Sequence, residues 1–481
     1  MNAIPFALLL ITPFDSAVFQ RESCLSTSYY GTYRDGPKYQ AVYAPEQQCI
    51  DSWVSDFAAE SATISAAFQP VQQLVWIEEE SVDENLKSQA LLSERGLDGF
   101  LQRLSSDQSY RGLDQALEDH EQDILADREQ ERQYEVLYRS PHAALLSVSH
   151  DKARTIDTLV PRFWKSTILP TSPVDYIPVP LYASQRIQDV ARNVGFDPVV
   201  ASAVNSLSVT QMKNDIRFLT GEDGKSGIVS RHSFAEGSLT AASWLKDRIE
   251  DTGAICELKP FLPGYAPNVV CRYEAIVNTS ETVLISAHYD SRGSFGSTRA
   301  PGGDDDGSGT TGILSIARAI GAKGIQFHSN VELVLFAGEE QGLLGSRAYS
   351  RELRAAESNL TLVIQADMTA YHAPDEPLQL GLPKTIGSPE VGDLVSAIAR
   401  IYSPELVVGY TSACCSDHQS FHEQGFPATQ VFERAGPIAD PMYHNSGDLS
   451  DREGYDFEQL KAIAKVQFAT VLHVAGFDIP K

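Results

Sequence analysis

The chain has 481 residues, 42% of them hydrophobic, and a formal net charge of −26. Such acidity argues against binding to nucleic acids or to anionic membranes, because both partners select basic surfaces. The length exceeds that of one typical domain. We therefore expect either two domains or a proregion followed by one large domain.

The first residues have the character of an export signal. The apolar run from Ile4 to Thr12 is as long as a signal-peptide core and too short to span a bilayer. No Lys or Arg precedes this run, and Asp15 stands near the expected cleavage region around Ala17. We predict a signal peptide over residues 1–17 and a secreted protein.

Two sequons and six cysteines fit this prediction. Asn278-Thr279-Ser280 and Asn359-Leu360-Thr361 have the pattern that N-glycosylation requires. The cysteines fall as three near neighbours: Cys24 and Cys49, Cys256 and Cys271, and Cys414 and Cys415. An even count in an exported protein indicates disulfides, although sequence leaves their connectivity open. The adjacent Cys414 and Cys415 form either a vicinal disulfide or two buried thiols.

The first third of the chain shows the pattern of a small α+β unit. Apolar runs within residues 72–81 and 142–161 predict strands, the second followed by a short helix, and residues 86–104 have helical periodicity. Residues 117–135 are rich in charge and predict a solvated polar segment. This region carries no recognisable cluster of catalytic residues.

A proline-rich passage from Leu169 to Tyr182 follows, with prolines at 170, 173, 178 and 180. Proline disfavours helix, and such extended, exposed segments are typical of domain boundaries and processing sites. We predict an N-terminal proregion or accessory domain over residues 18–181 and a catalytic domain over residues 182–481. Cleavage between Leu169 and Ala183 would then activate a zymogen.

Beyond this passage, strands and helices alternate. Amphipathic patterns predict helices within residues 209–220 and 237–253, and later ones within 310–320 and 391–403. Apolar runs predict strands within residues 282–291, 330–340, 360–370 and 426–433. The alternation predicts an α/β fold, a three-layer sandwich with a mostly parallel central sheet. Active sites of such sheets gather at the carboxyl ends of the strands.

Metal-binding residue types stand at these strand ends. His288 and Asp290 follow the first strand, Glu339 and Glu340 the next, and Asp367 the third. A later loop, "MYHNSGD", supplies His444 and Asp448. Taken singly, each of these residues has an ordinary reading as a solvated or helix-capping group. Together, imidazoles and carboxylates at one sheet edge suit zinc or a similar divalent ion.

The stretch "APGGDDDGSG" places Asp304, Asp305 and Asp306 between glycines. Three adjacent carboxylates repel one another unless cations neutralise them. A bridging aspartate between two metals explains the cluster, because five protein ligands exceed the need of one catalytic zinc. Glycines would let the backbone approach closely at this point.

These residues resemble the secreted dizinc aminopeptidases of the bacterial and fungal leucine-aminopeptidase type. The resemblance covers Ala183 to Lys481 and rests on the motifs "AHYDS", "APGGDDDGSG", "AGEEQGLLGS", "ADMTAY", "SDHQSFHEQGFPA" and "YHNSGD". It implies a zinc exopeptidase fold and two Zn²⁺ ions per chain. By the same resemblance His288 and Asp367 bind one zinc, Glu340 and His444 bind the other, and Asp305 bridges them. Glu339 would be the general base and Asp290 the partner of His288.

The resemblance further implies a cis peptide between Asp305 and Asp306. Four residues beside the motifs could form an apolar pocket for the first side chain of the substrate: Met368, Phe432, Met442 and Tyr443. The alternative is that these side chains belong to the ordinary core. The adjacent cysteines depart from the family, whose members often space two cysteines by three residues before "CSDH".

The predicted function is a secreted, monomeric zinc aminopeptidase that acts on peptides, with apolar first residues preferred. Two alternative functions are compatible with the same fold: a carboxypeptidase or glutaminyl-cyclase-like enzyme, and a metal-free binding or receptor-like domain. The complete ligand set disfavours the single-zinc cyclase and the metal-free domain.

Overall fold

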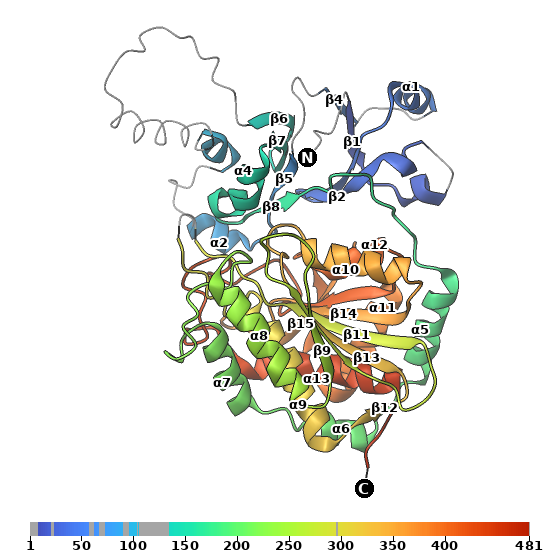
Figure 1. Cartoon of the computed structure of the whole chain (residues 1–481), viewed down its shortest axis with the longest axis vertical. Helices are drawn as coiled ribbons and strands as arrows, with labels where there is room; N and C mark the ends of the chain where they lie inside the picture. The colour runs from blue at the N-terminus through green and yellow to red at the C-terminus, as the bar shows by residue number, and fades with distance from the viewer. Residues whose placement is uncertain are drawn as a thin grey trace. The chain divides into compact units, whose positions relative to one another are not determined.

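The computed structural model describes residues 8–20, 24–56, 62–66, 73–89, 96–102, 104, 134–294 and 297–480. The chain divides into two compact units (Figure 1). Unit 1 comprises residues 1–80 and 88–175, and unit 2 comprises residues 81–87 and 176–481. This boundary lies inside the proline-rich passage that the sequence indicated.

Unit 1 contains two antiparallel four-stranded sheets. The first has the order β2-β3-β1-β4, with β1 Leu9–Pro13, β2 Tyr29–Asp35, β3 Lys38–Tyr43 and β4 Thr63–Ser65. The second has the order β6-β7-β5-β8, with β5 Gln73–Glu79, β6 Tyr134–Arg139, β7 Ala143–Val148 and β8 Trp164–Ile168. The short helices are α1 Gln47–Asp56, α2 Glu84–Gln89, which starts in unit 2, and α4 His150–Thr155. Alternating apolar residues such as Val75 and Ile77 fill one core, and Leu74 and Trp76 fill another.

The predicted leader contributes to this unit. Its apolar run supplies β1, which pairs with both β3 and β4 and whose Leu9 and Leu10 are fully buried. Removal of residues 1–17 would take away the strand between β3 and β4. Of the predicted polar segment, residues 117–133 lie outside the described residues.

Unit 2 is built on a six-stranded sheet with the order β17-β14-β11-β13-β10-β9. Its strands are β9 Ile255–Lys259, β10 Asn268–Tyr273, β11 Glu281–His288, β13 Asn330–Phe336, β14 Asn359–Ala366 and β17 Ala428–Val431. The pairs β14–β17, β11–β14 and β11–β13 are parallel, whereas β10–β13 and β9–β10 are antiparallel. The sheet is therefore mixed, and a mostly parallel sheet is not confirmed. The antiparallel edge comes from two strands that precede the alternating pattern and that Cys256–Cys271 links.

Helices cover both faces of this sheet (Figure 1). One face packs against α5 Leu181–Asn193, α6 Pro198–Val204, α7 Val209–Leu219, α8 Glu236–Glu250, α9 Gly307–Lys323, α11 Pro389–Tyr402 and α13 Phe457–Ala475. The other face packs against α10 Leu344–Ala355 and α12 His418–Glu423. Successive strand residues alternate between these cores, as Leu333 and Val334 show. Two small sheets complete the unit: β12 Gln326–Phe327 with β18 Phe477–Asp478, and β15 Gln379–Pro383 with β16 Val407–Thr411.

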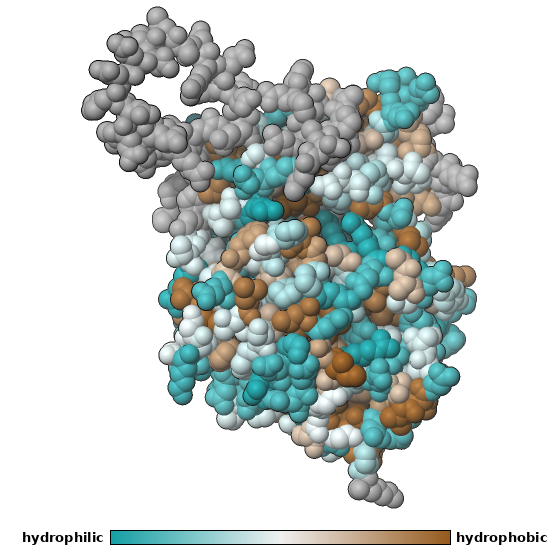
Figure 2. Space-filling view, in the orientation of Figure 1, coloured by the Kyte–Doolittle hydropathy of each residue, from teal (hydrophilic) through white to brown (hydrophobic). Residues whose placement is uncertain are grey.

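The surface seen in Figure 2 mixes polar and apolar residues in small patches over unit 2. Among the helices that the structure describes, none combines the length and the apolar character needed to cross a bilayer.

Candidate metal centre and active site

The carboxyl ends of three parallel strands bring the candidate residues together. β11 ends at His288, β13 ends three residues before Glu339, and β14 ends immediately before Asp367. His288 lies opposite Phe336 in the register of β11 and β13. Because these neighbouring strands run in the same direction, their ends meet at one edge of the sheet. The structure brings these predicted site residues together at this edge.

One group of possible ligands consists of His288, Asp305 and Asp367. Nε2 of His288 lies 3.3 Å from Oδ1 of Asp305 and 3.7 Å from Oδ1 of Asp367. On the other side of the ring, Nδ1 lies 3.2 Å from the backbone oxygen of Asp290. A proton on Nδ1 would make this hydrogen bond and leave the lone pair of Nε2 directed at the two carboxylates.

A second group consists of Asp305, Glu340 and His444. Nε2 of His444 lies 3.2 Å from Oδ2 of Asp305 and 3.0 Å from Oε2 of Glu340. Asp305 thus directs Oδ1 to the first group and Oδ2 to the second. One carboxylate with an oxygen in each of two ligand groups is the arrangement of a bridging ligand.

The neighbours of Asp305 hold the loop in place. Asp306 caps helix α9 through the backbone N–H of Gly309 and also accepts the backbone N–H groups of His288 and Met368. Asp304 accepts the backbone N–H of Ala370. The three consecutive aspartates therefore have different tasks: the outer two bind backbone groups of neighbouring strand ends, and the middle one faces the two histidines. The peptide between Asp305 and Asp306 is cis, as the family resemblance implied.

Glycine is required at two points of this loop. Gly302 has φ +54°, and a Cβ there would lie 2.4 Å from the backbone oxygen of Asp305. A Cβ at Gly309 would lie 2.5 Å from the carboxylate of Asp306. Both side chains would displace the aspartates, so the predicted role of the flanking glycines is confirmed.

Asp290 connects His288 with the Glu339–Glu340 segment. It is fully buried, accepts a hydrogen bond from Oγ of Ser233 at 2.9 Å, and lies 3.5 Å from Nδ1 of His288. The backbone N–H groups of Glu339 and Glu340 point to its oxygens at 3.4 and 3.5 Å. Asp290 is therefore placed to orient one ligand of each group.

The electrostatics of the site reflect several buried carboxylates around two imidazoles. Burial alone would lower the pKa of His288, but Asp290, Asp305 and Asp367 raise that pKa well above its usual range. Burial would likewise lower the pKa of His444, and mainly the charge of Glu340 raises it to about 9. Burial favours the neutral form of Asp305, but both histidines reverse this effect and hold its pKa below its usual range. The site thus favours positive charge between its carboxylates.

These residues fit divalent metal ions. Nε2 of His288 and both carboxylate oxygens of Glu340 are buried without a well-aligned hydrogen bond among the described residues. Buried polar atoms normally have partners. Two groups of imidazole and carboxylate donors that share one carboxylate match the ligands of a pair of zinc ions.

The sequence did not indicate several residues that hold the loops and ligands of the site in position. Arg231 is completely buried and donates to the backbone oxygens of Tyr289 and Gly302 at 2.8 and 2.7 Å. Nη1 of Arg292 lies 3.0 Å from Nδ1 of His444. No spacing in the sequence marks Arg231 or Ser233, which lie in a loop without a motif, and Arg292 directly follows the motif "AHYDS" without being part of it. Asp448, which the sequence did indicate, accepts the backbone N–H groups of Asp304 and Asp305.

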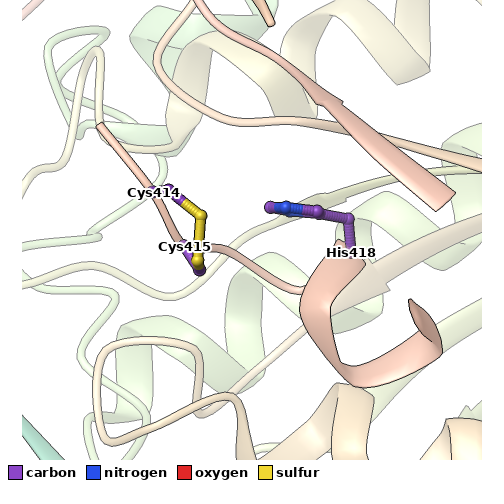
Figure 3. A group of neighbouring side chains, drawn as sticks. All are labelled: Cys414, Cys415 and His418. Carbon is purple, nitrogen blue, oxygen red and sulfur yellow. A yellow bond between two sulfur atoms is a disulfide. The ribbon is translucent and has the colours of Figure 1, made fainter. Parts of the chain in front are cut away.

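Of the two alternatives for Cys414 and Cys415, the structure has the vicinal disulfide, and Cys24–Cys49 and Cys256–Cys271 are the other two bridges. Figure 3 shows the vicinal bridge facing the ring of His418. These three residues could group around a metal ion, but both sulfurs are engaged in the disulfide. Nε2 of His418 lies 3.2 Å from the backbone oxygen of Ile386, and burial lowers the pKa of His418 to about 3. This neutral, buried histidine is part of the loop's packing.

Comparison with known proteins finds similarity to one family of peptidases. Residues 268–471 match the model described as peptidase family M28. A probable leucine aminopeptidase of Arthroderma otae is 27% identical over 308 residues, which cover 61% of this chain and 80% of the relative. Leucine aminopeptidase 1 of Grosmannia clavigera is 27% identical over 316 residues, which cover 60% of this chain and 73% of the relative.

Solved structures share the fold. The LapA aminopeptidase of Legionella pneumophila aligns with a TM-score of 0.56 and 18% identity, covering 72% of this chain and 94% of its own. LapB from the same organism aligns with a TM-score of 0.57 and 16% identity, covering 84% of this chain and 100% of its own.

The fold and the two ligand groups define a metallopeptidase. Within that class, residues 268–471 are similar to peptidase family M28, and the relatives that this chain resembles are named leucine aminopeptidases.

Proposed function

We propose that this chain is a secreted exopeptidase that uses two zinc ions to release apolar N-terminal residues from peptides. The observation that carries this proposal is the position of Asp305, whose two oxygens face His288 and His444 at 3.3 and 3.2 Å. His288 and Asp367 would hold one ion, Glu340 and His444 the other, and Asp305 would belong to both.

Glu339 is the proposed general base. It is buried, adjoins the ligand Glu340, and has its backbone N–H directed at Asp290. When bound, the zinc ions would supply Lewis-acid chemistry that activates water and polarises the scissile carbonyl. The carboxylate of Glu339 would accept the proton of the attacking water and deliver it to the leaving amine. Asp290 would hold His288 and the Glu339–Glu340 segment in fixed positions relative to each other.

The proposed preference for apolar first residues rests on two observations. Met368, Phe432 and Tyr443 are buried next to site residues in the sequence, and Tyr443 stacks on the ring of His444 with centroids 3.8 Å apart. The relatives reported above are named leucine aminopeptidases. Ordinary core packing of these side chains is the alternative, and a substrate panel distinguishes the two.

We further propose that residues 18–181 act as a proregion. Residues 171–173 and 175 of the proline-rich passage are exposed, and Asp175 ends unit 1. Exposed passages of this kind are preferred sites of proteolysis. A permanent accessory domain is the alternative. Intact and linker-cleaved proteins should then have equal activity, whereas a proregion predicts a rise after cleavage.

The test of the main proposal is a panel of aminoacyl chromogenic substrates, assayed with and without a chelator. We expect hydrolysis of leucyl substrates well above that of glutamyl substrates, and loss of activity with the chelator. Peptides blocked at the amino end but free at the carboxyl end should remain intact. N-terminal glutaminyl peptides should be hydrolysed rather than cyclised. Cleavage from the carboxyl end, or cyclisation, would assign the same fold to another reaction.

A further inference from the structure

A short segment of the N-terminal region belongs to the catalytic unit. The chain leaves unit 1 after Glu80, passes through unit 2 over residues 81–87, and returns to unit 1 at Ser88. Seven residues from the middle of the predicted proregion are therefore built into the peptidase unit. We call residues 81–87 the inserted segment.

Backbone hydrogen bonds fix the inserted segment beside the loop that follows β17. The N–H of Asp83 donates to the backbone oxygen of Ile438 at 2.7 Å, and the N–H of Ile438 donates to the oxygen of Ser81 at 2.8 Å. Val82 and Ile438 form a parallel bridge between these bonds. Such a pair of bonds requires one register of the segment against the loop.

Side chains strengthen this attachment. Val82 and Leu86 are 4% and 8% exposed, and Ile438 is 3% exposed. Oδ2 of Asp83 accepts a hydrogen bond from Nη1 of Arg434 at 3.0 Å. The guanidinium of Arg434 is held from its other side by Glu376. Buried aliphatic groups beside a partly buried ion pair are the contacts expected of a specific interface.

The receiving surface is formed by two loops of the active-site unit. Arg434 and Ile438 lie between β17 and the ligand His444, and Oγ of Ser81 lies 2.8 Å from Oγ of Ser412, two residues before the vicinal disulfide. The inserted segment thus touches both the loop that leads to a metal ligand and the loop that leads to Asp417.

We propose that this surface binds the inserted segment strongly enough to retain the N-terminal fragment after the linker has been cut. Hydrolysis of one peptide bond in residues 169–183 breaks the covalent link, but the contacts of residues 81–87 remain. Release of the fragment then needs a second step, either dissociation or a further cut near residues 81–87. The retention itself does not depend on the proposed aminopeptidase activity or on natural processing, because the experiment introduces the cut.

The experiment places a recognition sequence for a site-specific protease between Ser172 and Pro173 in the full chain. Thr171, Ser172 and Pro173 are exposed, so the site is open to the protease. After complete cleavage under native conditions, we expect both fragments to co-elute in size-exclusion chromatography. Separation of the fragments in the otherwise unaltered protein would overturn the proposal.

Two variants and a control locate the attachment. Val82→Asp should weaken retention about ten- to hundredfold, the factor expected for loss of one buried aliphatic side chain. Asp83→Asn removes the ion pair with Arg434 and should raise the dissociation rate about threefold. Glu84→Gln, an exposed position on the same segment, should retain the fragment like the parent protein.

The uncut variants are first compared by thermal unfolding. If uncut Val82→Asp does not fold, Asp83→Asn decides the question, because it conserves shape. Retention in folded Val82→Asp equal to that of the parent, or an unchanged dissociation rate in Asp83→Asn, would contradict a role for the inserted segment.

Discussion

Asp290→Asn separates the orienting role of this carboxylate from the role of the metal ligands. The substitution keeps the shape of a completely buried side chain that accepts from Ser233 and lies 3.5 Å from Nδ1 of His288. Loss of a carboxylate partner behind a ligating histidine typically lowers metal affinity about 10- to 100-fold, or about 1.4–2.7 kcal/mol. We expect the site that contains His288 to weaken by this factor.

The same variant should also lower stability without metal. An asparagine oriented to keep the bond from Ser233 turns its amide toward the backbone N–H of Glu339, so two donors face each other. An unsatisfied buried donor costs about 1–3 kcal/mol. Zinc affinity is measured by competition with a chromophoric chelator, and stability by urea unfolding of the metal-free protein. Asp393→Asn, an exposed position on α11, is the control. Wild-type zinc affinity in Asp290→Asn would refute the orienting role.

Three further outcomes follow from the site. Glu339→Gln should bind both metals and unfold like the parent but lose about 10²- to 10⁴-fold in kcat, because a base and not a ligand is removed; near-full turnover would assign the base elsewhere. Asp305→Ala should lose metal from both groups, and two tightly held zinc ions in that variant would move the bridge to a neighbour. In the metal-free protein, the pKa of His444 is about 9, above the ~6.5 of an unfolded histidine. Protonated His444 therefore stabilises the fold fully below about pH 6.5, and this contribution is lost as the pH rises through 9. Urea unfolding between pH 6 and 9.5 should show the decline, and His444→Gln should make it smaller, while His288, whose pKa is also raised, still contributes.

Much of the fold and of the candidate site could be predicted from the hydrophobic periodicity of the strands and from the residue types at their ends. The runs around β11, β13 and β14 have apolar centres, as in strands covered on both faces, and each ends at or is soon followed by a His, Asp or Glu. Because parallel strands end at one edge, the meeting of His288, Glu340 and Asp367 could be predicted from chain order alone. Which of the three aspartates bridges could not, since that assignment came from the family resemblance.

The residues that the sequence did not reveal act through long-range contacts. Ser233 lies 57 residues from Asp290, and Arg231 lies 58 residues from Tyr289, whose backbone oxygen it binds. Local pattern carries no information on such pairs. The edge strand β9 was missed because its exposed residues Ile255, Glu257 and Leu258 do not follow a regular alternation. The insertion of residues 81–87 into unit 2 likewise depends on tertiary contacts, and no local sequence pattern indicates it.

Zinc titration of the chelator-stripped protein tests the central claim most directly. Leucyl-substrate hydrolysis and bound metal are measured together as zinc is added. A site in which Asp305 bridges two ions predicts that two equivalents bind and that full activity is reached at the second. Saturation of binding and activity at one equivalent, or zinc binding without release of N-terminal residues, would contradict the account.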